Sequence, residues 1–385
     1  MINDEFIFSS ESVTEGHPDK VADQISDAVL DELISLDQNS RVACETLITR
    51  NRVVLSAEIK SNANIDYEKV VKETLIEIGY DNPSTGFDAN QCEIDLYIEE
   101  QSSDISMGVD QVDSGIIGAG DQGLMFGYAT NENDSYMPYP ILLSHKLTKS
   151  LADKRKNKSM NFLQPDGKSQ VSIKYENNKA IYADTILIST QHSEDITTKD
   201  LTEAVIEEII KKEVPSELIS DKTKFIVNPT GRFVVGGPQG DTGLTGRKII
   251  VDTYGGWAKH GGGAFSGKDP SKVDRSACYM ARYMAKNIVA SGLLTECEIQ
   301  LAYAIGKPEP ISFNIRTKDE NSNDIINKIL NNINSFFDCT PRGIIEELDL
   351  LKPIYRKTAS YGHFGRSDQG FKWEEINKSE LIKKI

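Results

Sequence analysis

The sequence is poor in cysteine and has no long apolar segment. Its 385 residues include five cysteines, which are scattered and form no C-x-x-C pair. We therefore expect neither a disulfide framework nor a zinc site, and we expect a cytoplasmic protein. No run approaches the ~18–20 apolar residues of a membrane-spanning helix. Residues 1–5 also lack the basic and apolar regions of a signal peptide, so no membrane association is expected.

Positive charge is scarce as well. The chain has 43 lysines and arginines against 59 aspartates and glutamates, which gives a net charge of -16. Because this charge repels phosphate backbones over most of the surface, nucleic acid is not expected as a partner. A hydrophobic fraction of 38% and a charged fraction of 26% are ordinary for a folded protein. At ~100–200 residues per domain, the length predicts two or three domains.

A repeated order of helices and strands runs along the chain. Apolar periodicity predicts long helices that begin near residues 18, 138 and 271, and shorter helices that begin near residues 66, 199 and 323. Strand-like runs lie between them, at residues 42–49, 53–59, 92–99, 171–175, 181–190, 225–227, 296–303 and 311–316. Asn177-Asn178 predicts a hairpin turn between two of these strands. The order long helix, strand, strand, shorter helix, strand predicts three similar α+β units, each a sheet with helices on one face.

These units divide the chain into predicted domains. We place an N-terminal α+β domain at residues 1–102 and a loop at residues 103–117. A central α+β domain follows at residues 118–233, and a C-terminal α+β domain at residues 234–385.

Glycine is concentrated between residues 231 and 267, and cations lie among and just after these glycines. A flexible linker would be rich in serine and would lack such charges. Glycine lets backbone amides approach a ligand closely, so the segment is interpreted as a binding surface. Its cations can hold a triphosphate, and in so acidic a chain this local concentration is informative; they are Arg247, Lys248, Lys268, Lys272 and Arg275.

Two motifs match nucleotide-binding patterns only in part. Residues 118–123 fit G-x-G-x-x-G, but a polar loop precedes them and strand-like residues 124–129 follow, so a dinucleotide fold is rejected. Residues 262–268 fit the P-loop pattern, but Asp269 stands where a magnesium-binding Ser or Thr is needed, and Pro270 removes a helix amide. Amides and a lysine that face phosphate remain a sound interpretation of the second motif.

Carboxylates that suit a divalent cation stand near both ends of this pattern. Asp19 follows His17 at the start of the first long helix, and Asp274 lies in the helix after the glycine-rich segment. Magnesium commonly takes one or two carboxylates together with phosphate oxygens. Helix capping and solvation are the alternative roles of His17 and Asp19.

Several segments together resemble the S-adenosylmethionine synthases, or methionine adenosyltransferases. They are Gly16-His17-Pro18-Asp19-Lys20, residues 118–123 (GAGDQG), residues 228–233 (NPTGRF), residues 261–275 (GGGAFSGKDPSKVDR) and residues 361–366 (YGHFGR). The resemblance runs nearly end to end. It implies three α+β domains related by pseudo-threefold symmetry, with residues 103–117 as a mobile active-site loop that excludes water.

The resemblance also implies a reaction. ATP and L-methionine form S-adenosylmethionine when the methionine sulfur attacks C5′ of ATP, and the bound tripolyphosphate is then hydrolysed to phosphate and pyrophosphate. Two Mg²⁺ per site and K⁺ are expected. A homodimer or a dimer-of-dimers tetramer is expected, with active sites between subunits. A thioether needs no general base, so catalysis should depend on stabilising the departing polyphosphate and on alignment.

Residue roles follow from the matched motifs. The expected catalytic residues are His17, Lys168, Arg247, Lys248, Lys268 and Lys272. The expected ATP-binding residues are His17, Asp166, Lys168, Arg232, Phe233, Asp241, Arg247, Lys248, Ala264 and Lys268. The expected methionine-binding residues are Glu58, Gln101, Asp121, Asp241 and Lys272. Asp19 and Asp274 are expected to bind Mg²⁺, and Glu45 to belong to the K⁺ site.

Other interpretations stay open from the sequence. Glu58 could be a solvated strand end, Phe233 a core residue and Lys168 a surface charge. At the level of the whole chain, one alternative is a phosphotransferase that hydrolyses ATP with the same cations. Another is an inactive regulatory subunit that binds nucleotide, although it would have no reason to keep His17 and Lys268.

Overall fold

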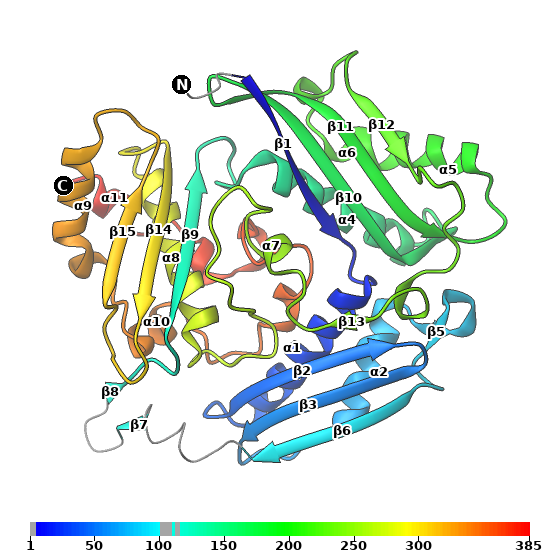
Figure 1. Ribbon diagram of the computed structural model, residues 1–385, viewed down its shortest axis with the longest axis horizontal. Coiled ribbons are helices and arrows are strands. Elements are labelled where there is room, and N and C mark those ends of the chain that lie inside the picture. The colour runs from blue at the N-terminus through cyan, green and yellow to red at the C-terminus, as the bar shows by residue number, and fades with distance from the viewer. Residues whose placement is uncertain (1–4, 101–109, 112–115) are drawn as a thin grey trace.

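Three β-sheets face the viewer in Figure 1, and their principal helices lie behind them. The computed structural model describes residues 5–100, 110–111 and 116–385. None of the helices in these residues has the length and apolar character needed to cross a membrane.

The first unit follows the predicted order. Its elements are α1 (Pro18–Leu36), β2 (Arg41–Thr49), β3 (Arg52–Lys60), α2 (Tyr67–Ile78) and β6 (Glu93–Glu100). Strands β2 and β3 form an antiparallel hairpin, and β6 lies parallel to β3. The apolar stripe of α1 is buried because it packs against β2 and α2.

The second unit repeats this arrangement. Its elements are α4 (Tyr139–Lys156), β10 (Leu163–Glu176), β11 (Lys179–His192), α5 (Thr198–Val205) and β12 (Lys224–Val227). Strands β10 and β11 are antiparallel and β12 is parallel to β11. Asn177 and Asn178 have φ angles of 49° and 61°, as a tight hairpin turn requires, which confirms the predicted turn.

The third unit is shorter. Its elements are α8 (Val273–Ala290), β14 (Glu296–Tyr303), β15 (Ser312–Arg316) and α9 (Asn323–Phe336). No strand follows α9 in the described chain, so the predicted order is incomplete here. Helix α10 (Pro341–Glu347) and the C-terminal segment pack against α8 instead.

Each sheet also contains one strand from a distant part of the chain. Strand β13 (Gly243–Leu244) pairs with β2, β1 (Glu5–Val13) pairs with β10, and β9 (Gly123–Thr130) pairs with β14, all antiparallel. The three units therefore share one plan, which confirms the predicted α+β fold of similar sheet-plus-helix units. The domain ranges 1–102, 118–233 and 234–385 remain a prediction. Each of these three strands lies in one predicted range but pairs with a sheet formed by another.

The remaining strands and α-helices are short. They are β4 (Asp81–Asn82), β5 (Phe87–Asp88), β7 (Asp110–Gln111), β8 (Ile116–Ile117), α6 (Lys211–Glu213), α7 (Ile249–Asp252) and α11 (Ser379–Ile382). The buried side chains form two apolar clusters, one shared by the first and third units and one within the second. The glycine-rich segment crosses the middle of the molecule between the sheets (Figure 1).

Candidate active site

His17 stands at the N-terminus of α1, which begins at Pro18. Its Nδ1 accepts a hydrogen bond from the Asp19 amide at 3.2 Å, and its side chain is buried. Burial, together with the charges of Lys248 and Lys168, lowers the pKa of His17 to about 3. The imidazole is therefore neutral at physiological pH. Because Nδ1 accepts a hydrogen bond, the ring proton lies on Nε2, which can act as a donor.

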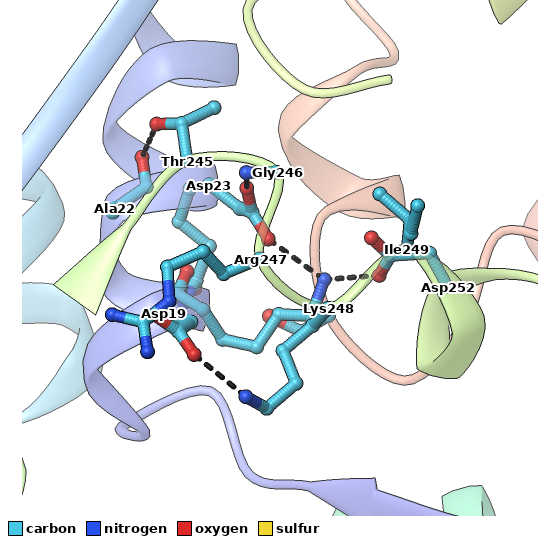
Figure 2. Close-up of polar contacts among 12 residues, drawn as sticks. Asp19, Ala22, Asp23, Thr245, Gly246, Arg247, Lys248, Ile249 and Asp252 are labelled. Atoms are coloured by element: carbon cyan, nitrogen blue, oxygen red, sulfur yellow. Dashed lines mark hydrogen bonds and ion pairs between the residues drawn. The ribbon is translucent and has the colours of Figure 1, made fainter. Parts of the chain in front are cut away.

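Asp19 joins α1 to the turn formed by residues 243–248, called here the first turn. Its Oδ2 lies 2.6 Å from Lys248 Nζ, and its Oδ1 lies 3.7 Å from Arg247 Nε and accepts a hydrogen bond from the Leu244 amide at 3.1 Å. Burial opposes ionisation, but these hydrogen bonds and the Lys248 charge outweigh it and lower the pKa of Asp19. Figure 2 shows Asp19 facing Arg247 and Lys248 across this turn.

A second turn, formed by residues 265–268, carries the next predicted cation. It lies beside β2, where the backbone of Lys268 forms an antiparallel β-bridge with Ala43. The Cys44 amide donates a hydrogen bond to the Gly267 carbonyl at 3.0 Å. Lys268 Nζ lies 2.6 Å from Asp274 Oδ2. Lys272, the N-cap residue of α8, pairs with Asp269. The side chains of Lys268 and Lys272 remain partly exposed, so both are accessible to an anion.

Arg275 does not belong to this accessible group. The sequence analysis counted it among the cations available to a triphosphate, but its side chain is fully buried. Its guanidinium forms a two-pronged pair with Asp27, at 2.7 and 2.9 Å, and also donates to the carbonyls of Phe265 and Lys268. A buried arginine needs such a counter-ion, so that expectation is wrong.

Several of the predicted ATP-binding residues lie in or beside the loop that precedes the first turn. Asp166 Oδ2 accepts a hydrogen bond from the Gly237 amide at 2.9 Å. Burial, with a contribution from the charge of Asp241, raises the pKa of Asp166 to about 6. The Phe233 amide donates to His192 Nε2 at 3.1 Å, and Arg232 pairs with Glu194 at the surface.

The other predicted residues are placed by the sheets. Ala264 lies beside Gly246 of the first turn, and Lys168 is exposed on β10 opposite Val13. Glu45 and Glu58 are exposed on β2 and β3, and Glu58 lies opposite Ala43. Lys268, Ala43 and Glu58 therefore follow one line across neighbouring strands. Asp121 is exposed just before β9.

Gln101 and most of the loop 103–117 lie outside the described residues.

Sequence reasoning missed the residues that hold the two turns in place. Asp23 accepts a hydrogen bond from the Gly246 amide at 2.9 Å, and Asp27 accepts one from the Gly267 amide at 2.8 Å. Lys20, fully buried, pairs with both Asp23 and Asp252. The signal was the spacing of four residues between Asp19, Asp23 and Asp27, on a helix whose residues are mostly buried.

The carboxylates suit a metal that is shared with phosphate. No group of three or more potential metal ligands exists among the described residues. Asp19 and Asp274 are instead single oxygen donors, each beside cations that phosphate would contact. This donor set fits magnesium, which uses few protein carboxylates and completes its shell with phosphate and water.

Three repeated α+β units bring cation-bearing turns beside carboxylates, an arrangement that can bind a polyanion. The sequence matches family models described as the N-terminal, central and C-terminal domains of S-adenosylmethionine synthetase, at residues 5–103, 116–233 and 235–375. The chain belongs to the S-adenosylmethionine synthetase family. This confirms the resemblance seen in the sequence and the prediction of a methionine adenosyltransferase that uses ATP and methionine.

Individual relatives named S-adenosylmethionine synthase match over nearly their whole length. The protein of Helicobacter pylori (strain P12) is 56% identical over 384 residues, which cover 99% of both chains. That of Petrotoga mobilis (strain DSM 10674 / SJ95) is 55% identical over 393 residues, with 98% of both chains covered. That of Clostridium botulinum (strain Alaska E43 / Type E3) is 54% identical over 387 residues, covering 98% of this chain and 99% of its own.

Proposed function

We propose that the methionine sulfur attacks C5′ of ATP and that the displaced tripolyphosphate stays bound and is hydrolysed. In the first step a sulfur lone pair forms the S–C5′ bond. The C5′–O bond breaks, and its electron pair leaves on the tripolyphosphate. In the second step water cleaves the tripolyphosphate to phosphate and pyrophosphate. Since the thioether has no proton to lose, the protein's task is to stabilise the leaving group.

The observation that carries this proposal is the state of His17. It is a buried neutral imidazole among cations, and its Nδ1 already accepts the Asp19 amide. Only Nε2 can then donate, and it can do so to the oxygen that bridges C5′ and the α-phosphorus. A charged imidazolium would be costly beside Lys248 and Lys168, so we assign His17 the role of hydrogen-bond donor to the departing oxygen.

The cations are held ready by carboxylates that a polyphosphate can replace. Lys248, Lys268 and Lys272 each pair with an aspartate and each keeps a partly exposed side chain. We assign these residues, with Lys168 and Arg247, to the phosphate oxygens, and Lys272 also to methionine. Binding of ATP would then free Asp19 and Asp274 to hold magnesium, while Glu45 contributes to a potassium site. Two bound Mg²⁺ would neutralise charge on the polyphosphate.

The remaining assignments follow position. We assign Asp166, Arg232, Phe233, Asp241 and Ala264 to the nucleoside part of ATP. Glu58, Gln101, Asp121 and Asp241 are assigned to methionine, with the loop 103–117 as a lid over the site.

Apolar residues on the sheets favour an oligomer. Ile7 on β1, Tyr97 on β6 and Leu124 on β9 are 52%, 63% and 49% exposed. By strand alternation they lie on the sheet faces opposite the helices. We take these exposed apolar side chains, one on each of the three sheets, as support for an interface on these faces. We infer a homodimer or a dimer-of-dimers tetramer with active sites between subunits.

The reaction is tested with ATP that carries ¹⁸O at the 5′ bridging position, together with methionine, Mg²⁺ and K⁺. Attack at C5′ predicts unlabelled S-adenosylmethionine and labelled phosphate products by mass spectrometry. Formation of ADP without S-adenosylmethionine would instead indicate a phosphotransferase. We expect His17→Ala and Lys268→Ala to lower turnover by roughly 10²–10³-fold with little change in melting temperature. Wild-type turnover in both variants would refute the assigned site.

A further inference from the structure

We propose that Asp23 and Asp27 are positioning residues, through which α1 sets the placement of the two cation-bearing turns against the tripolyphosphate. This inference rests on the proposed function, because it takes Lys248 and Lys268 as phosphate ligands. Neither aspartate can touch a substrate, since both are fully buried. They act through the backbone of the turns.

The spacing of the aspartates matches the two turns. Residues four apart on a helix lie on one face, about 6 Å apart along the axis. Asp19, Asp23 and Asp27 have this spacing, and each accepts one backbone amide, from Leu244, Gly246 and Gly267 at 3.1, 2.9 and 2.8 Å. Asp19 and Asp23 hold the first turn, and Asp27 holds the second.

Each turn is seated so that a small shift would be resisted by the backbone. Gly246 and Gly267 have φ angles of +79° and +82°, in the left-handed region that favours glycine. A Cβ added to Gly267 would lie 1.9 Å from the Cys44 carbonyl oxygen. The amides that the aspartates bind are therefore at the tightest points of the two turns, directly before Arg247 and Lys268.

The second oxygen of each aspartate is also used. Asp23 Oδ2 accepts a hydrogen bond from Lys20 Nζ at 2.9 Å, and Lys20 also pairs with Asp252. Asp27 binds Arg275, which in turn donates to the Phe265 and Lys268 carbonyls. The pair Asp27–Arg275 thus holds both amide and carbonyl groups of the second turn. Charge-assisted hydrogen bonds of this kind are strong and directional, so they can fix where a lysine is presented.

Helix α1 supplies a matched control. Asp31 continues the same spacing and accepts the amides of Tyr355 and Arg356, both at 2.9 Å. It holds a segment that carries none of the residues assigned to phosphate. Asp31→Asn should therefore leave tripolyphosphate affinity unchanged, whereas Asp23→Asn and Asp27→Asn should lower it.

The experiment is a set of double-mutant cycles with tripolyphosphate as the probe, measured by calorimetry on the full-length protein. We expect Asp23→Asn to weaken tripolyphosphate binding roughly 10-fold, because the side chain that accepts the hydrogen bond of the Gly246 amide loses its negative charge. This effect should shrink when Lys248 is already alanine, with Arg247 left on the turn, and should persist in full when Lys268 is alanine. Asp27→Asn should show the reverse pattern, and the KM for methionine should not change in Asp23→Asn.

The cycles separate this inference from the proposed function. Equal effects of an aspartate variant in both lysine backgrounds, or a lower melting temperature with unchanged tripolyphosphate affinity, would overturn the inference alone. If neither Lys248→Ala nor Lys268→Ala weakened binding, the proposed function would fail, and the inference with it. Should Asp27→Asn not fold because Arg275 loses its counter-ion, the Asp23 cycles decide, since Lys20 keeps Asp252.

Discussion

Two regions of this chain contain ion pairs of similar length in opposite surroundings. In the third unit, Glu374 lies 3.0 Å from Arg282 and 2.7 Å from Lys286, and all three side chains are at most 2% exposed. In the candidate active site, Lys268 lies 2.6 Å from Asp274, and these side chains are 23% and 20% exposed. The distance between the paired ions therefore does not distinguish the two regions.

The partners of each cation do separate them. Arg282 also donates to the carbonyls of Tyr128, Tyr136 and Ser135, and Lys286 also donates to Ser367 and to the Glu374 carbonyl. Their hydrogen-bonding capacity is filled from within the fold. Lys268 Nζ has one described partner, Asp274, and the lysine side chain is partly exposed to solvent. A cation with donors to spare can exchange a carboxylate for phosphate, whereas a filled one stabilises the fold.

Removal of the Glu374 carboxylate, which Arg282 and Lys286 share, should give the largest change in stability. Glu374→Ala leaves two buried cations without their counter-ion, so we expect the free energy of unfolding to fall by about 3–5 kcal/mol. Urea denaturation measures this change. The matched variant is Asp274→Ala, for which we expect less than about 1 kcal/mol because Lys268 remains solvated, together with a large loss of turnover. Similar destabilisation by the two variants would remove the distinction between the regions.

The sequence predicted those elements whose signal is local. Helices α1, α4 and α8 begin within two residues of the expected positions, because their apolar periodicity and the prolines at 18, 138 and 270 lie in the elements themselves or at their starts. Strands β1 and β13 were not predicted. The alternation of buried and exposed residues in β1 depends on the sheet that the strand joins, and β13 is only two residues long. Their partners are distant in sequence, and no local pattern encodes them.

The same limit applies to the candidate site. Lys268 and Lys272 are identifiable because they follow a run of glycines, and in the structure both side chains are partly exposed. Arg275 lies in the same run but is buried by Asp27, which is 248 positions away. Burial of a charge is decided by tertiary contacts, so neighbouring cations in one motif can have opposite fates.

A second test compares the half-buried carboxylate of Glu132 with the buried carboxylate of Glu374. Glu132 is bound by Tyr175 Oη at 3.0 Å and by the Tyr139 amide, and burial raises its pKa to about 7. For Glu374, burial acts in the same direction, but Arg282 and Lys286 outweigh it and lower its pKa. Folded Glu132 therefore keeps a proton between pH 4.5 and 7 that the unfolded chain releases, so its contribution to stability falls as pH rises through this window.

Glu132→Gln keeps the hydrogen-bond acceptor and removes the titration. Relative to the wild type, we expect the variant to be more favoured at pH 8 than at pH 5, by roughly 1–3 kcal/mol. Unfolding curves at both pH values measure the difference. Glu374→Gln serves as the control, since a lowered pKa predicts nearly the same penalty at pH 5 and pH 8. A pH-independent effect of Glu132→Gln would contradict the expected protonation.

The smallest effect should come from an ion pair that belongs to neither region. Lys211 lies 2.5 Å from Glu207, four residues earlier on a helical segment, and the two side chains are 47% and 59% exposed. This separation is no longer than those of the buried pairs, yet water solvates both ions when the contact breaks. We expect Lys211→Ala to change the free energy of unfolding by only about 0.3–0.5 kcal/mol, less at high salt, without changing turnover. A loss as large as that of Glu374→Ala would mean that pair distance, and not the supply of further partners, controls the strength of these contacts.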